Sequence, residues 1–315
     1  MLAVFGICVG LLVCEVTVRV LGAADPRPTG YAPVKTKGRA GGPTNSREYR
    51  DLERSLAKPP GVHRIVSLGD SFAWGYRIEF EDTYSQRLER VLSRLRGERW
   101  EVVNLARPGM NSVEEARQLE DEGLAYAPDL VLLGYCLNDS EDEAGAEARR
   151  GRYWEELQNE KRQAPGLLER SALFRFVAHR IEATALNRRR VAAYHEQYRA
   201  DYPGWVAGQE ALRTMAALCR KRGIPFVVAI FPLFGNPLGE GYPFAEIHAK
   251  VAGAARDAGA VVVDLLPAYQ GLRFDLLVVD GPNDEHPNEI AHRIAAARIL
   301  AKVDELVPPN EAASR

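Results

Sequence analysis

The sequence predicts an α/β fold in which a five-stranded parallel sheet lies between two layers of helices. Five short apolar runs alternate along the chain with stretches whose apolar residues recur at helical spacing. Two of these stretches end in glycine just before the next apolar run, at Arg222-Gly223 and Ala258-Gly259, as helices often do. Short strands that alternate with helices favour a three-layer α/β/α sandwich.

The first 23 residues form an apolar segment that contains two charges, Glu15 and Arg19. About 20 helical residues cross a bilayer core, so the segment is predicted to be a single-pass membrane anchor. Glu15 and Arg19 stand one helical turn apart and could pair near the interface. The folded part of the chain is expected at a membrane, outside the cytoplasm. The opposite orientation stays open, because Arg27, Lys35, Lys37 and Arg39 follow the segment and the positive-inside rule would place them in the cytoplasm. The alternative is a secretory signal cleaved near Ala23, which would leave a secreted or periplasmic protein.

The rest of the chain divides into a tether and one large domain. Residues 24–60 are rich in Pro, Gly and charge, which is typical of a linker. The folded domain is predicted over residues 61–310. Residues from about 140 to 205 interrupt its rhythm, because they are charged, aromatic and mostly helical in pattern. They are predicted to be a helical insertion over one edge of the sheet. The predicted strands cover residues 62–68, 100–106, 129–135, 224–231 and 260–266.

Composition and charge argue against several classes of function. The chain has 41 Lys and Arg against 43 Asp and Glu, a formal net charge of −2, whereas nucleic-acid-binding domains are usually strongly basic. The one dense basic cluster, Arg188-Arg189-Arg190, is interpreted as a solvated helix face. The four cysteines form no Cys-x-x-Cys pair and the six histidines lack metal-ligand spacing. No metal and no cofactor are therefore expected.

Polar residues from four distant parts of the sequence are expected to meet at one edge of the sheet. In an open parallel sheet, ligands bind beyond the carboxyl ends of the strands. The first predicted strand ends at Ser71, the second leads to Gly109, and the third leads to Asn138. His286 stands just before the last predicted helix. Independent turns have no reason to converge in this way, so the pattern favours an active site.

These residue types fit acyl transfer through a serine nucleophile. A serine hydroxyl is a weak nucleophile until a base takes its proton, and His286 is suited to that role near neutral pH. Asp284 could hold the other imidazole nitrogen and stabilise the charged ring. The backbone N–H groups of Ser71 and Gly109 and the side-chain amide of Asn138 are plausible donors to the oxyanion.

The same residues resemble the sequence blocks of the SGNH (GDSL-type) hydrolases, which are named after Ser, Gly, Asn and His. Ser71 lies in the Gly-Asp-Ser block, Gly109 in the second block, Asn138 in the Asn-Asp block and His286 in the His-Pro-Asn block. The similarity covers roughly residues 60 to 306 and keeps the order of the blocks. It implies a flavodoxin-like sheet with strand order 2-1-3-4-5 and metal-free ester hydrolysis.

The stretch "TNSREYRDLE" also resembles the lead-in of bacterial members with a single N-terminal membrane segment. Two features depart from the family pattern. The family acid often stands three positions before the histidine, where this chain has Asn283. Asp284 stands two positions before it, a spacing associated with the membrane-anchored branch, and Asp280 is the alternative acid. The long insertion at 140–205 prevents any substrate from being carried over.

The primary prediction is a serine esterase that acts on an ester, such as an O-acyl group of an envelope glycan or lipid. An O-acyltransferase would use the same residues, with a sugar hydroxyl in place of water in the second step. A non-catalytic envelope-binding module of the same fold is a further alternative, although it would be free to lose the site residues. A lipase of the α/β-hydrolase kind is excluded, because Ala73 occupies the last position of its Gly-x-Ser-x-Gly motif.

Overall fold

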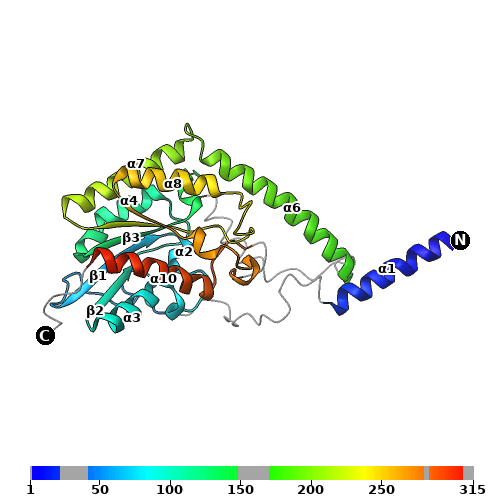
Figure 1. The fold of residues 1–315 in the computed structure, drawn as a ribbon, viewed down its shortest axis with the longest axis horizontal. Helices are drawn as coiled ribbons and strands as arrows, with labels where there is room; N and C mark the ends of the chain where they lie inside the picture. The colour runs from blue at the N-terminus through cyan, green and yellow to red at the C-terminus, as the bar shows by residue number, and fades with distance from the viewer. Residues whose placement is uncertain are drawn as a thin grey trace.

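The computed structural model of the chain has the predicted α/β architecture, with helices on both faces of a central sheet (Figure 1). All five strands are parallel, and their order is β2-β1-β3-β4-β5, which confirms the expected 2-1-3-4-5 topology. The structure describes residues 2–21, 42–142, 144–145, 147, 170–279 and 284–307.

The strands begin and end within a few residues of the predicted runs. The central strand β3 is buried along its whole length, as expected for a nearly all-apolar strand that is covered on both faces. The strands are β1 (Val62–Gly69), β2 (Arg99–Asn104), β3 (Leu130–Tyr135), β4 (Phe226–Ile230) and β5 (Val261–Asp264).

Two layers of helices cover the sheet (Figure 1). Helices α3 and α10 pack together on one face, and α4, α7 and α8 form the layer on the other face. Short helices lie at the carboxyl ends of the strands and position the loops there. The helices are α1 (Leu2–Val20), α2 (Ser71–Trp74), α3 (Tyr84–Arg96), α4 (Ser112–Asp121), α6 (Ala172–Gln197), α7 (Pro203–Lys221), α8 (Ala245–Ala258), α9 (Leu266–Tyr269) and α10 (Glu289–Leu306), with 3₁₀ turns η1 (Phe80–Asp82), η2 (Gly123–Tyr126), η3 (Leu137–Ser140) and η5 (Phe274–Leu276).

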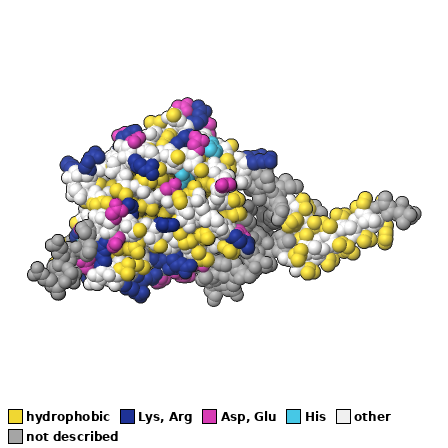
Figure 2. All heavy atoms as spheres, viewed as in Figure 1, with side chains coloured by type: hydrophobic (Ala, Val, Ile, Leu, Met, Phe, Trp, Pro, Cys, Tyr) yellow, Lys and Arg dark blue, Asp and Glu magenta, His cyan; other side chains and the backbone are white. Residues whose placement is uncertain are grey.

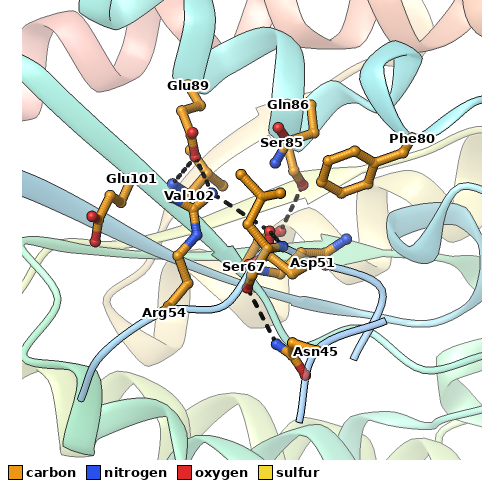
Figure 3. A network of polar contacts seen from close by, with 12 residues as sticks. Asn45, Asp51, Arg54, Ser67, Phe80, Ser85, Gln86, Glu89, Glu101 and Val102 are labelled. Carbon is orange, nitrogen blue, oxygen red and sulfur yellow. Dashed lines mark hydrogen bonds and ion pairs between the residues drawn. The ribbon is translucent and has the colours of Figure 1, made fainter. Parts of the chain in front are cut away.

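Residues 42–60 differ from the predicted tether, because they pack against the domain. Figure 3 shows how two of their side chains, Asp51 and Arg54, point into the fold. Arg54 Nη2 lies 2.6 Å from Glu89 Oε2 on α3, and Asp51 accepts the backbone N–H of Asn104 at 3.1 Å. The charged composition of this stretch suggested a solvated linker, but these charges are paired inside the protein. The remaining part of the predicted tether, residues 24–41, lies outside the described residues.

The insertion contains one long helix, α6, as its helical pattern predicted. The end of α6 is attached to the sheet by Tyr198, which is buried and whose hydroxyl lies 2.8 Å from the hydroxyl of Tyr135 at the end of β3. The rings of Tyr198 and Trp205 pack with their centroids 4.9 Å apart. Residues 148–169 of the insertion lie outside the described part of the chain.

The N-terminal helix α1 projects from the domain and touches the start of α6 (Figure 1). Its apolar side chains are exposed, and they form the hydrophobic surface at one end of the molecule in Figure 2. Within the described residues, no helix combines the length and apolar character needed to cross a bilayer. The predicted membrane anchor is therefore not supported by the structure.

The two charges of α1 do pair as predicted. Arg19 forms an ion pair with Glu15 one helical turn away, and Arg19 Nη2 donates to the carbonyl of Arg170 at 2.9 Å. The Glu15 carboxylate accepts hydrogen bonds from the backbone N–H groups of Ala172 and Leu173 at 2.9 and 2.8 Å. Glu15 therefore caps the first turn of α6, where backbone N–H groups have no partner within the helix.

Candidate active site

The sharp turn after β1 places Ser71 at the start of helix α2. Gly69, the last residue of β1, has a φ of +145°, which favours glycine. A Cβ at this position would stand 2.6 Å from the Cβ of Ala73 and 2.8 Å from the carbonyl oxygen of Gly134. The backbone of β1 thus approaches β3 and α2 more closely than a side chain would permit. Ser71 is half-buried at the carboxyl edge of the sheet.

Ser71, His286 and Asp284 form a hydrogen-bonded chain. Ser71 Oγ lies 3.0 Å from His286 Nε2, and His286 Nδ1 lies 2.8 Å from Asp284 Oδ1. The same Asp284 oxygen accepts the backbone N–H of His286 at 3.2 Å. The structure therefore brings together all three residues that the sequence predicts as nucleophile, base and acid. Asp280, the alternative acid, lies outside the described residues.

The surroundings of His286 tune its proton affinity. Burial alone would lower the pKa of His286, but the charge and hydrogen bond of Asp284 outweigh burial and raise the pKa above 6.5. The negative charges of Asp70 and Glu285 act in the same direction. The ring of Tyr76 packs against the imidazole with a centroid distance of 4.4 Å and an angle of 46° between the two ring planes.

The carboxylate of Asp70 organises the turn that holds Ser71. One oxygen, Oδ1, accepts the backbone N–H of Phe72 at 2.8 Å and so caps α2. The other, Oδ2, accepts from Asn138 Nδ2 at 2.9 Å and from Ser71 Oγ at 3.3 Å. Asp70 thus links the turn after β1, which carries Ser71, to Asn138 in the segment after β3. In the sequence, Asp70 is visible only as the middle residue of the Gly-Asp-Ser block, and its contact with Asn138 is not predictable from that block.

The predicted oxyanion donors lie at the same edge of the sheet. Asn138, in η3, is buried, and its amide is oriented by the bond to Asp70. Gly109 has a φ of +80° in the loop between β2 and α4. The backbone N–H of Arg107, in the same loop, donates to the carbonyl of Gly69 at 3.2 Å and ties this loop to the end of β1.

A buried carboxyl group lies behind this edge and was not anticipated. Glu115, in α4, is fully buried. Burial raises the pKa of its carboxyl well above 4.5, and the nearby charges of Asp70 and Glu114 raise it further. Burial and the charge of Asp70 thus both favour the protonated form of Glu115. A glutamate in an amphipathic helix is expected to be solvent-exposed, so the burial of Glu115 could not be predicted from the sequence.

The interpretation of Arg188-Arg189-Arg190 as a solvated face is wrong for its last member. Arg190 Nε lies 3.0 Å from Glu285 Oε1, beside the catalytic-site residues Asp284 and His286. The periodicity of the sequence could not predict this contact, because it joins α6 to a loop almost one hundred positions later in the chain. Among the described residues, no group of three or more His, Cys, Asp or Glu side chains could hold a metal ion.

A serine, a histidine and an aspartate hydrogen-bonded in series at the carboxyl edge of a parallel sheet are the arrangement of a serine hydrolase. The chain belongs to the GDSL-like lipase/acylhydrolase family, whose sequence model matches residues 67–294. It is accordingly a hydrolase of the GDSL (SGNH) type that acts on esters. No curated protein matches the sequence.

Several solved structures are similar to this chain. TesA is 17% identical over 78% of this chain and 100% of its own, with a TM-score of 0.48. The lipase/acylhydrolase from Enterococcus faecalis is 15% identical over 79% of this chain and 99% of its own, with a TM-score of 0.47. The psychrotrophic esterase EstA from Pseudoalteromonas sp., inhibited by monoethylphosphonate, is 14% identical over 77% of this chain and 97% of its own, with a TM-score of 0.42.

Proposed function

We propose that this chain hydrolyses carboxylic esters through an acyl-enzyme formed on Ser71. The observation that carries the proposal is the hydrogen-bonded chain from Ser71 Oγ through His286 to Asp284, with distances of 3.0 and 2.8 Å. A base within hydrogen-bond reach of a hydroxyl, itself oriented by a carboxylate, is the arrangement that activates a serine nucleophile.

In the first half of the reaction, Ser71 Oγ attacks the ester carbonyl carbon while its proton moves to His286 Nε2. Asp284 stabilises the resulting imidazolium through Nδ1. The tetrahedral oxyanion takes hydrogen bonds from the backbone N–H groups of Ser71 and Gly109 and from the amide of Asn138. Each such donor typically lowers the barrier by about 3 kcal/mol. The alcohol leaves as its bond to the carbonyl carbon breaks, and it takes the proton from Nε2.

In the second half, a water molecule attacks the acyl-enzyme and gives its proton to His286 Nε2. The second tetrahedral intermediate collapses, the bond to Ser71 Oγ breaks, and the proton returns to Oγ as the carboxylic acid departs. If a sugar hydroxyl took the place of water at this point, the same residues would transfer the acyl group instead. The identity of the second acceptor is thus an outcome of the product analysis below.

We also propose that α1 attaches the domain to a membrane, with the catalytic domain outside the cytoplasm, where O-acyl groups of envelope glycans or lipids are the substrates. Two features of α1 support its association with lipid. Most of its large apolar side chains from Val4 to Val20 are exposed, and Val18 is the exception. Its charged groups, Glu15 and Arg19, make their hydrogen bonds to each other and to the start of α6.

The test of the catalytic proposal compares the full-length wild-type chain with Ser71→Ala on p-nitrophenyl esters of increasing acyl length, with a metal chelator present. Turnover of the wild type should fall by at least ~10⁴-fold in Ser71→Ala, because the nucleophile is lost. Ser55→Ala is the matched control and should keep wild-type activity, because it changes an exposed serine of residues 42–60, the lead-in segment.

A fluorophosphonate should label wild-type Ser71 and leave Ser71→Ala unlabelled, as read by mass spectrometry of the intact chain. Products are analysed with and without a polyol, so that acyl transfer is seen directly as an acylated polyol. A wild-type chain that neither turns over any ester nor takes the label would defeat the proposal.

A further inference from the structure

The second half of helix α6 lies against the loop that carries the catalytic residues. Arg190 Nε stands 3.0 Å from Glu285 Oε1, and Arg190 Nη2 donates to Asn187 Oδ1 at 3.0 Å. Asn187 in turn donates through Nδ2 to Asn236 Oδ1, also at 3.0 Å. One turn of α6 therefore holds two separate loops at the carboxyl edge of the sheet.

These two loops also contact each other at Glu285. The backbone N–H of Phe234 donates to the carbonyl of Glu285 at 3.3 Å. A Cβ on Gly235 would stand 3.1 Å from the carbonyl oxygen of Asp284 and 3.2 Å from Arg190 Nη2. The backbone between the acid and the base is thus enclosed by the loop after β4 on one side and by α6 on the other.

The Arg190–Glu285 pair is partly shielded from water. The two side chains are 26% and 21% exposed. Partial burial makes their attraction stronger than that of a typical surface pair. Glu285 is adjacent to both Asp284 and His286, so its charge is felt at the imidazole. A guanidinium beside Glu285 offsets that charge.

We propose that Arg190 is a positioning residue for the esterase site, which holds Glu285 and the backbone between Asp284 and His286 and offsets the Glu285 charge at the imidazole. The inference rests on the proposed function, in which His286 is the general base. It assigns to the helical insertion a role in the chemistry, beyond covering the sheet.

Several charged or titratable groups face His286 from the elements packed around it. The groups on the turn after β1 and on the loop with Asp284 lie close to the imidazole ring of His286. His292 lies behind this ring on α10, where burial lowers the pKa of His292 to about 3, so it is neutral. The groups are Asp70, Tyr76, Asp284, Glu285 and His292, with Arg190 acting through Glu285.

The experiment measures the pH dependence of kcat/KM for the full-length wild type, Arg190→Ala and Arg190→Lys. Loss of the guanidinium removes its offset of the Glu285 charge, so the pKa of His286 rises further and the acidic limb of the pH profile moves to higher pH. On the plateau, kcat should fall about 10-fold as the loop loses its restraint. Arg190→Lys keeps the positive charge, so its acidic limb should lie closer to that of the wild type than the limb of Arg190→Ala. Arg189→Ala removes an exposed arginine from the same helix and should match the wild type.

A second readout needs no turnover: the protonation of His286 is followed by NMR of its ring signals in the wild type and in Arg190→Ala. The inference would be overturned if the acidic limb of kcat/KM and the NMR titration of His286 both stayed at their wild-type pH in Arg190→Ala. This holds even if the variant were less stable. If the wild type hydrolysed no ester, the proposed function would fail. The NMR comparison would still decide whether Arg190 acts on His286.

Discussion

At the scale of single residues, Asp284 occupies the position that the acid of a catalytic triad requires. Its Oδ1 contacts both Nδ1 and the backbone N–H of His286, so one oxygen fixes the ring and the loop together. The bond to Nδ1 leaves Nε2 as the nitrogen that faces Ser71. The sequence alone left Asp280 as an alternative.

Asp284→Asn should reduce kcat by about 10³-fold, because an amide neither stabilises the imidazolium nor maintains the required tautomer. Asp284 raises the pKa of His286, so its removal should also move the acidic limb of kcat/KM to lower pH. The measurement is a pH–rate profile with a p-nitrophenyl ester. Asp280→Asn is the comparison variant and should retain near-wild-type kcat. The opposite ranking of the two variants would assign the acid to Asp280.

The residues that could be predicted are those whose chemistry follows directly from local sequence. Ser71 follows a strand and His286 precedes a helix. Turn residues and a change in the spacing of apolar residues mark both boundaries in the sequence. The contacts of Glu115 and Arg190 could not be predicted, because both depend on which distant element packs over them. A buried glutamate and an exposed one have the same local sequence pattern.

At the scale of elements, the turn that follows α2 is held by a buried arginine from the lead-in segment. Arg50 donates through Nη1 to the carbonyls of Trp74 and Gly75 at 3.0 and 2.6 Å, and through Nη2 to that of Ile78 at 2.6 Å. Its guanidinium also lies 4.9 Å above the Trp74 ring. Burial lowers the pKa of Arg50 to about 10, so it stays charged at neutral pH. Tyr76, which packs on His286, lies within this turn.

Arg50→Met should lower the free energy of unfolding by about 2–4 kcal/mol, since three backbone carbonyls lose a charged donor. It should also lower kcat, because the turn carries Tyr76 to His286. Chemical denaturation gives the stability and ester hydrolysis gives the rate. Arg47→Met changes an exposed arginine of the same segment and serves as the control. Equal midpoints for the two variants would show that the turn does not depend on Arg50.

The strands and helices of the domain were predictable because their burial imposes a pattern on the sequence. β3 reads as a continuous apolar run because both of its faces are covered. The prediction that the lead-in segment is part of a tether was wrong. Its charged composition suggested a linker, but Arg50, Asp51 and Arg54 are buried and paired with groups from distant parts of the sequence.

At the scale of the whole molecule, α1 lies apart from the sheet and touches the domain through the insertion helix (Figure 1). The exposed apolar side chains of α1 make up an extended hydrophobic surface (Figure 2). Such surfaces mark sites of interaction with lipid or protein. The predicted attachment to a membrane stays a prediction.

Attachment through α1 predicts that the full-length chain floats with phospholipid vesicles in a density gradient. Leu11→Asp combined with Leu12→Asp should reduce the bound fraction at least ~10-fold, because each charge opposes transfer into the apolar layer by a few kcal/mol. Leu95→Asp alters an equally exposed leucine on α3 and should not affect flotation. Wild-type chains that stay at the bottom of the gradient would contradict the attachment.

The cap that Glu15 places on α6 has a practical consequence for anyone who shortens the chain. The pKa of Glu15 is lowered from 4.5 to about 2 by hydrogen bonds from the backbone of Leu173 and Ala172, so the ionised carboxylate favours this contact. The contribution is complete above pH 4.5 and is lost as the pH falls towards 2. Removing the apolar N-terminus to ease purification would remove this cap as well. Arg190 lies about 27 Å along α6 from this capped end, so loss of the cap could alter the helix that carries Arg190, and a shortened chain is not equivalent to the whole enzyme.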